Sequence, residues 1–119
     1  MWLMLLLIVI DQITKHFFTT VVNTGAAFGI LKGFNIPLLI INIIALAVCI
    51  FYYFKEKSLR LPLIFLISGI IGNSIDRIIF GHVRDFINIG ILNFPIFNLA
   101  DSYNVIGVVI LVMILWREK

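Results

Sequence analysis

Three long apolar stretches constrain the fold of this chain more than any other feature. They cover Ile36–Phe54, Leu61–Phe80 and Ile96–Trp116, and the first holds 19 residues without a charge. As an α-helix, such a stretch reaches about 28 Å at ~1.5 Å per residue, close to the hydrocarbon thickness of a bilayer. The other two stretches carry only three charged residues between them. The sequence therefore predicts that all three span a membrane.

A fourth and weaker candidate span is Met1–Phe18, whose apolar run is broken at Asp11. It lacks a basic leading segment and a small-x-small cleavage site, so we interpret it as a retained helix and not as a signal peptide. Composition agrees with a membrane protein, since 62% of the residues are hydrophobic and 13% are charged, against about 25% charged in soluble domains. We expect an all-α integral membrane protein with four transmembrane helices.

Basic residues set the expected orientation of these helices. Three lie in the connector Lys55–Arg60 and two in the tail Arg117–Lys119. If the helices alternate in direction, both segments lie on one side, the cytoplasmic side, and both chain termini face the cytoplasm. The net charge of +3 is ordinary for a membrane protein and gives no reason to expect a nucleic-acid partner.

The four aspartates are expected to gather toward the opposite, extracytoplasmic surface. Asp76 lies about 24 Å along its helix from Arg60, and Asp101 lies about 22 Å from Trp116. A carboxylate near the bilayer centre costs roughly 2.5–3.5 kcal/mol on insertion scales, so several of them in so short a chain indicate a functional site. The alternative is a set of paired acids that only packs helices together.

Two Asn-x-x-Asp pairs place an amide one helical turn before a carboxylate. They are Asn73 with Asp76 and Asn98 with Asp101. Residues at i and i+3 share a helix face, so each amide can donate to its acid and hold its rotamer. Arg77 can neutralise Asp76, which makes a structural role for Asp76 as reasonable as a catalytic one.

Asp85 follows the helix breaker Gly81 and is expected in a non-helical segment. Its neighbour Arg84 would point to the opposite face of an extended segment, which leaves Asp85 free to meet Asp101. Two carboxylates that share a site hold one proton between them, as in aspartic proteases, where one activates a water and the other binds the scissile carbonyl. From spacing alone, Asp76 with Asp101 is an equally acceptable pair.

The remaining polar residues carry weaker signals. Asp11 and Lys15 are four residues apart and can form a simple intrahelical ion pair. Asn23–Phe28 is a small-residue turn suited to close approach of a peptide, although an ordinary connecting turn is the simpler explanation. His16 and His82 have no Cys or Glu at ligand spacing, so we expect no zinc site.

Five motifs of this sequence occur in the same order in one family. They are Asp11–Lys15 (DQITK), Asn23–Phe28 (NTGAAF), Gly72–Arg77 (GNSIDR), Val83–Ile87 (VRDFI) and Phe97–Ser102 (FNLADS). Each motif is short, but together, over nearly the full length of the chain, they resemble the lipoprotein signal peptidases, also called signal peptidase II.

The resemblance implies an intramembrane aspartyl endopeptidase of the bacterial inner membrane, with a single transmembrane peptidase domain over residues 1–119 and an active site near the extracytoplasmic face. Such an enzyme removes signal peptides from diacylglyceryl-modified prolipoproteins by cleavage before the lipidated cysteine. No metal or organic cofactor is implied. The expected partners are this substrate, membrane lipid and globomycin-type inhibitors, and the chain is expected to act as a monomer.

Carried over by motif, the catalytic dyad falls on Asp85 and Asp101, which decides the choice that spacing leaves open. The supporting polar residues would be Asn73, Asp76, Arg77 and Asn98. The substrate groove would include Asp11, Lys15, Asn23 and Gly25. Two departures from the family pattern stand out: only seven residues separate Lys15 from Asn23, which predicts a reduced extracytoplasmic cradle segment, and Arg84 replaces a usual apolar residue.

Two other functions are compatible with parts of this pattern. A small four-helix transporter coupled to protons or cations would spread its acids along a path across the membrane. The stretches Ile36–Phe54, Leu61–Phe80 and Ile96–Trp116 carry no aspartate in their cytoplasmic halves, which argues against that function. A catalytically inactive homologue that binds lipidated peptides would retain the same motifs.

Overall fold

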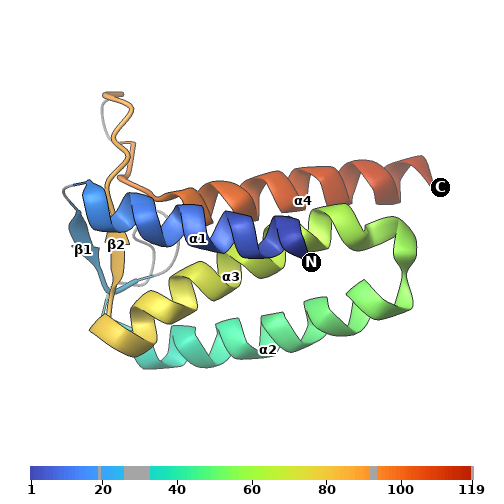
Figure 1. Cartoon of the computed structure of the whole chain (residues 1–119), viewed down its shortest axis with the longest axis horizontal. Coiled ribbons are helices and arrows are strands. Elements are labelled where there is room, and N and C mark those ends of the chain that lie inside the picture. Colours follow the sequence, from blue (N-terminus) through green and yellow to red (C-terminus); the bar gives the residue numbers. More distant parts are fainter. Residues whose placement is uncertain (19, 26–32, 92–93, 119) are drawn as a thin grey trace.

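The computed structural model describes residues 1–18, 20–25, 33–91 and 94–118. Within them there are four α-helices and two short strands (Figure 1). One strand lies between the first and second helices, the other lies between the third and fourth, and the two pair into a sheet. The helices are α1 (Trp2–Phe17), α2 (Asn35–Lys55), α3 (Arg60–Phe80) and α4 (Leu99–Arg117), with a short 3-10 helix η2 (Lys57–Leu59) between α2 and α3. The strands are β1 (Val21–Asn23) and β2 (Val83–Asp85).

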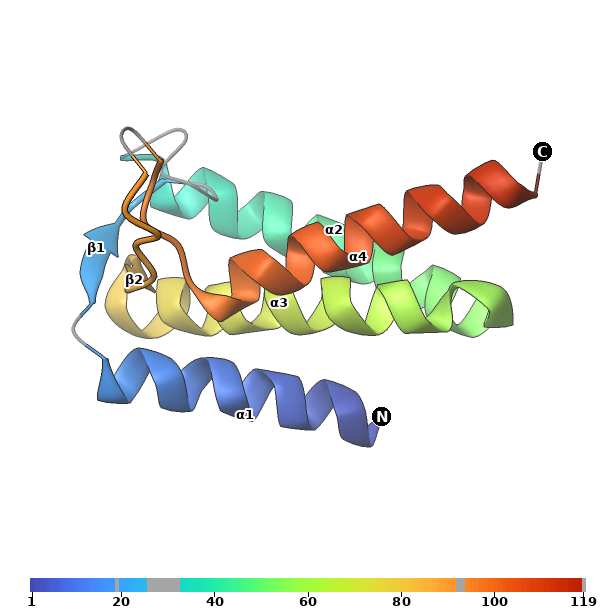
Figure 2. The same cartoon turned by 90° about the horizontal axis from the view of Figure 1, so that it is seen from above.

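The helix α3 is the centre of the fold. It packs against each of the other three helices, and in Figure 2 it lies between α1 and α2. Ten of its residues are buried, whereas Leu38 is the one buried residue of α2. Most side chains of α2 therefore face outward, and they are apolar, as lipid-facing side chains must be.

Three helical segments are long and apolar enough to cross a membrane, which confirms the three predicted apolar helices. They are α2, the segment Lys57–Phe80 that contains α3, and α4, with mean hydropathies of 2.4, 1.7 and 1.9. α4 begins at Leu99 and not at Ile96, because Asn98 caps it. α1 has 16 residues, or about 24 Å, so the fourth span stays a prediction.

Glycines allow α3 and α4 to approach each other closely. A Cβ atom added at Gly69 of α3 would lie 2.6 Å from the carbonyl oxygen of Ala100. A Cβ added at Gly107 of α4 would lie 2.9 Å from the carbonyl oxygen of Pro62. Small residues at such contacts are a common means of packing helices in membranes.

A small antiparallel sheet covers one end of the helices. α3 ends at Phe80 and is capped by Gly81, whose φ of +74° suits a glycine, and the chain then turns back into β2. Val21 of β1 stands opposite Asp85 of β2, and Asn23 stands opposite Val83. The prediction that Asp85 lies outside a helix is therefore confirmed, and among the described residues between α1 and α2 the strand β1 has three residues.

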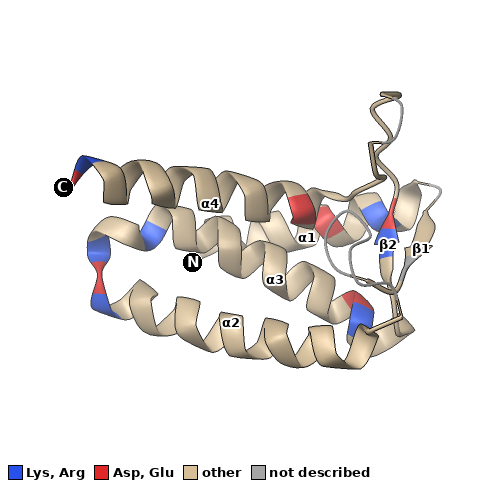
Figure 3. Ribbon diagram, turned by 180° about the vertical axis from the view of Figure 1, so that it is seen from behind, with Lys and Arg blue, Asp and Glu red and all other residues tan. Residues whose placement is uncertain are grey.

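Charged residues separate into two groups along the helices (Figure 3). The connector between α2 and α3 and the end of α4 carry basic and glutamate residues at one end of the molecule. The aspartates lie toward the other end, near the sheet, together with the remaining described basic residues. The aspartates thus gather at the end of the helices near the sheet, whereas the glutamates lie at the opposite end.

Candidate active site

Asn98 stands at the centre of a buried polar cluster at the start of α4. Its side-chain oxygen accepts a hydrogen bond from the backbone N–H of Asp101 at 2.8 Å, and its backbone N–H donates to Asp101 Oδ2 at 3.3 Å. This reciprocal capping box satisfies two of the free N–H groups of the helix start. The side-chain nitrogen of Asn98 donates to Asp85 Oδ1 at 2.8 Å. Asn98 therefore contacts both acids of the expected dyad.

Asn73 of α3 joins the same cluster from the neighbouring helix. Its amide nitrogen donates to Asp101 Oδ1 at 3.0 Å, and its amide oxygen accepts from Asn98 Nδ2 at 3.0 Å. Each asparagine side chain thus donates to an acid of another segment and not to the acid that follows it by three residues. The expectation from the Asn-x-x-Asp spacing is wrong here, because Asn98 precedes its helix with extended backbone angles and Asn73 faces α4.

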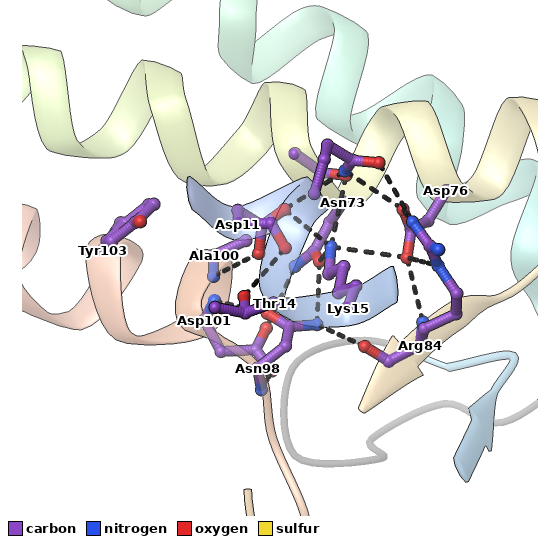
Figure 4. Close-up of polar contacts among 12 residues, drawn as sticks. Asp11, Thr14, Lys15, Asn73, Asp76, Arg84, Asn98, Ala100, Asp101 and Tyr103 are labelled. Carbon is purple, nitrogen blue, oxygen red and sulfur yellow. Dashed lines mark hydrogen bonds and ion pairs between the residues drawn. The ribbon is translucent and has the colours of Figure 1, made fainter. Parts of the chain in front are cut away.

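Asp76 is held by two cations and an amide (Figure 4). It accepts hydrogen bonds from the backbone N–H of Arg84 at 3.0 Å and from Nε and Nη2 of the same residue at 3.1 and 3.0 Å. Lys15 Nζ lies 3.3 Å from its carboxylate, and Gln12 Nε2 donates to it at 3.2 Å. The prediction that Arg77 neutralises Asp76 is therefore wrong, since Arg84 and Lys15 do so.

Arg77 points away from Asp76, since successive residues of an α-helix are about 100° apart around its axis. Its guanidinium donates to the carbonyl oxygens of Thr24 and Gly25, which follow β1. It also donates to Asn35 Oδ1 at the start of α2, at 3.0 Å. Arg77 thus ties the segment after β1 to the helices.

Asp11 and Lys15 form the predicted ion pair within α1, at 2.8 Å, and both side chains are fully buried. Lys15 lies between Asp11 and Asp76, as Figure 4 shows. Asp11 also accepts a hydrogen bond from the backbone N–H of Ala100 at 2.9 Å, which links α1 to the first turn of α4. Lys15 and Arg84 together balance the charges of Asp11 and Asp76.

The residues expected to line a substrate groove divide into two sets. Asp11 and Lys15 are buried beneath the sheet end of the helices. Gly25 is buried after β1, and Asn23 pairs with Val83 in the sheet. Positions 26–28 of the small-residue turn, and the side chain of Asn23, lie outside what the structure describes.

Sequence reasoning missed two side chains that build this cluster. Gln12 donates to Asp11, to Asp76 and to the carbonyl oxygen of Gly72, and it accepts from Arg84. Arg84 was expected to point away from Asp85 and does so, but its ion pair with Asp76 was not predicted. Each is a polar residue adjacent in sequence to an aspartate, Asp11 or Asp85, which is the signal that could have drawn attention to them.

The chemistry available to the cluster is that of carboxylates. Among the described residues, no group of three or more His, Cys, Asp or Glu side chains is arranged to hold a metal ion. Asp85 and Asp101 are 3% and 2% exposed, and neutral amides contact both. Asn98 contacts both of these buried carboxylates, and carboxyl groups are among the side chains that serve as general acids and bases.

Comparison with known proteins gives consistent matches. Residues 3–117 match the family described as signal peptidase (SPase) II. The lipoprotein signal peptidase of Streptococcus thermophilus strain CNRZ 1066 is 43% identical over 101 residues, which are 82% of this chain and 66% of that protein. The lipoprotein signal peptidase of Halothermothrix orenii is 40% identical over 104 residues, 85% of this chain and 70% of that protein. The chain thus spans roughly two thirds of the length of these relatives.

Two solved structures have the same fold. Both are described as bacterial membrane enzymes determined by the in meso method, at 2.3 Å and 1.9 Å resolution, and both are 31% identical to this chain. The first superposes with a TM-score of 0.89 and covers 98% of this chain and 87% of its own. The second has a TM-score of 0.84, with 99% and 92% covered.

Proposed function

Because the chain belongs to the signal peptidase II family, we propose that it is an aspartyl endopeptidase that removes signal peptides from diacylglyceryl-modified prolipoproteins. Cleavage would occur just before the lipidated cysteine. The family match over residues 3–117 and the name shared by the curated relatives support this activity. Together with the apolar helices, family membership makes the chain a bacterial membrane protein.

The proposed catalytic dyad is Asp85 with Asp101, and the observation that carries it is their shared contact with Asn98. The competing acid, Asp76, is already engaged by Arg84 and Lys15. A carboxylate bound by two cations stays ionised and has no proton to donate. A fixed anion of this kind suits a supporting role for Asp76, so Asp85 is the proposed partner of Asp101.

In the proposed reaction, the ionised member of the dyad removes a proton from a water molecule, which attacks the scissile carbonyl carbon. The protonated member gives its proton to the carbonyl oxygen, and a tetrahedral intermediate forms. The first carboxyl then gives the proton it took from water to the leaving nitrogen as the C–N bond breaks. The second carboxyl takes back a proton from a hydroxyl group of the intermediate, which leaves a free carboxyl product and restores the dyad. Asn73 and Asn98 would hold the two carboxyl groups in place throughout, because their amides contact both.

The other proposed roles follow from position around the dyad. Asp76 and Arg77 would support the site from α3, through β2 and through the segment after β1. The groove for the substrate backbone would include Asn23 and Gly25 in the segment of and after β1, together with the buried side chains of Asp11 and Lys15 in α1.

We propose four membrane spans, including α1, in a single domain with both termini in the cytoplasm. Support comes from the basic residues at the end opposite the sheet and from the aspartates near the sheet (Figure 3). The dyad would then lie near the extracytoplasmic face of the inner membrane, where the acyl chains of the substrate can stay in lipid. We further propose that the chain acts as a monomer and that it binds membrane lipid and globomycin-type inhibitors.

A cleavage assay with a purified diacylglyceryl-prolipoprotein tests this function. Wild type, Asp85→Asn, Asp101→Asn and Asp76→Asn are compared, with globomycin as a control and helical circular dichroism as the check on folding. We expect cleavage by wild type, inhibition by globomycin, and no cleavage by Asp85→Asn or Asp101→Asn.

Two results would contradict the proposal at different levels. If Asp85→Asn keeps full activity while folded Asp76→Asn loses it, the assigned dyad is wrong. If wild type leaves every lipidated substrate intact, the protease activity itself is wrong.

A further inference from the structure

Arg84 connects three elements of the fold through one guanidinium group (Figure 4). It extends from β2 to Asp76 of α3, where Nε and Nη2 bind the two carboxylate oxygens at 3.1 and 3.0 Å. Nη2 also donates to Gln12 Oε1 of α1 at 2.9 Å. The guanidinium carbon lies 4.5 Å from the ring centroid of Phe80, the last residue of α3.

The backbone of Arg84 is fixed as well as its side chain. Its N–H donates to Asp76 Oδ2 at 3.0 Å, and its carbonyl oxygen accepts from Asn98 Nδ2 at 3.3 Å. Asp76 is fully buried and the side chain of Arg84 is 14% exposed, so little water can compete for the hydrogen bonds between them. A bidentate arginine–carboxylate pair of this kind specifies orientation as well as distance.

The next residue along β2 is Asp85, and its side chain leaves the opposite face of the strand. Asp85 therefore takes its position from the strand that Arg84 holds. The sheet alone is a weak support, because β1 and β2 pair over only three residues each and isolated two-stranded sheets are marginally stable.

We propose that Arg84 is a positioning residue for the dyad: its grip on Asp76 and Gln12 fixes β2 so that the Asp85 carboxylate stays at Asn98. This inference rests on the proposed protease function and deepens it. Arg84 does not touch the reacting atoms. Its effect passes through the strand, and it makes the alignment of Asp85 depend on α1 and α3 together.

The inference predicts a specific kinetic pattern. Loss of the guanidinium leaves the groove in place but lets Asp85 shift, and a displacement of about 1 Å can cost roughly 100-fold in rate. Arg84→Gln should therefore lower kcat by about 10- to 100-fold while KM changes by less than about threefold. Arg84→Lys should recover part of kcat, because it retains the charge but not the two parallel hydrogen bonds.

The experiment combines these kinetics with hydrogen exchange of the backbone amides of residues 83–87. Arg60→Gln is the matched control, since Arg60 is an arginine at the opposite end of α3 that binds the carbonyl oxygen of Tyr53. We expect faster exchange over residues 83–87 in Arg84→Gln, a smaller change in Arg84→Lys, and wild-type exchange and cleavage in Arg60→Gln.

Three results would overturn the inference. They are wild-type kcat in Arg84→Gln, unchanged exchange over residues 83–87, or a loss of cleavage that only follows the fraction of unfolded protein. Exchange is measured without substrate, so it judges the role of Arg84 even if wild type cleaves nothing. A failure of the proposed function and a failure of this inference are thus distinguishable.

Discussion

Asn98 performs two tasks that substitution can separate. Its side-chain oxygen caps α4 by accepting from the N–H of Asp101, and its side-chain nitrogen donates to Asp85, to Asn73 and to the carbonyl oxygen of Arg84. Asn98→Ser keeps an oxygen that can cap the helix but removes the donor nitrogen. Asn98→Ala removes both.

The magnitudes follow from burial, since Asn98 is 0% exposed. Leaving a buried acceptor such as Asp85 Oδ1 without its donor costs about 1–3 kcal/mol. Loss of a helix cap costs about 1 kcal/mol more. We therefore expect Asn98→Ser to lower the free energy of unfolding by about 1–3 kcal/mol, and Asn98→Ala by about 1 kcal/mol beyond that.

Both quantities can be measured by unfolding in mixed micelles, followed by helical circular dichroism, and by the cleavage assay. Both variants should lose cleavage, because neither has the nitrogen that holds Asp85. Equal stability of Asn98→Ser and Asn98→Ala would refute the capping argument. Full cleavage by Asn98→Ser would refute the role of the amide donor.

Two further substitutions test the buried charges and the helix packing. Lys15→Met leaves two buried aspartates without their shared cation, and breaking a buried ion pair costs about 3–5 kcal/mol, so little folded protein should be recovered after purification. Normal recovery with wild-type thermal stability would contradict this. Gly69→Ala forces a methyl group to within 2.6 Å of the carbonyl oxygen of Ala100 and should lower the free energy of unfolding by about 1–3 kcal/mol, measured in mixed micelles. An unchanged free energy of unfolding would contradict the argument that close packing of α3 against α4 requires a glycine at position 69.

Features that depend on local sequence were predictable. Long apolar stretches predicted the three apolar helices, and Gly81 marked the end of α3 because its left-handed backbone angle suits glycine. The ion pair between Asp11 and Lys15 followed from their spacing on one helix. The two-stranded sheet was not foreseen in detail, since three-residue strands leave almost no pattern in a sequence.

Contacts between helices were not predictable in the same way. The partner of Asp76 depends on how α3 is rotated against α1 and where β2 returns, and hydrophobic periodicity fixes neither. Arg77 was adjacent in sequence but points elsewhere, whereas Arg84 arrives from eight residues away. For the same reason, the hydrogen bond from Asn73 of α3 to Asp101 of α4 could not be predicted from the sequence.

The ion pair between Asp11 and Lys15 also bears on the order in which the protein is made. α1 is synthesised before α3, yet its buried partners lie about sixty residues later, at Gly72, Asn73 and Asp76 of α3. A lone aspartate or lysine on a newly made helix would be costly in lipid during that interval. Because Asp11 and Lys15 lie one turn apart, their charges cancel within α1, and the proposed insertion of α1 into the bilayer would not need α3 to be present.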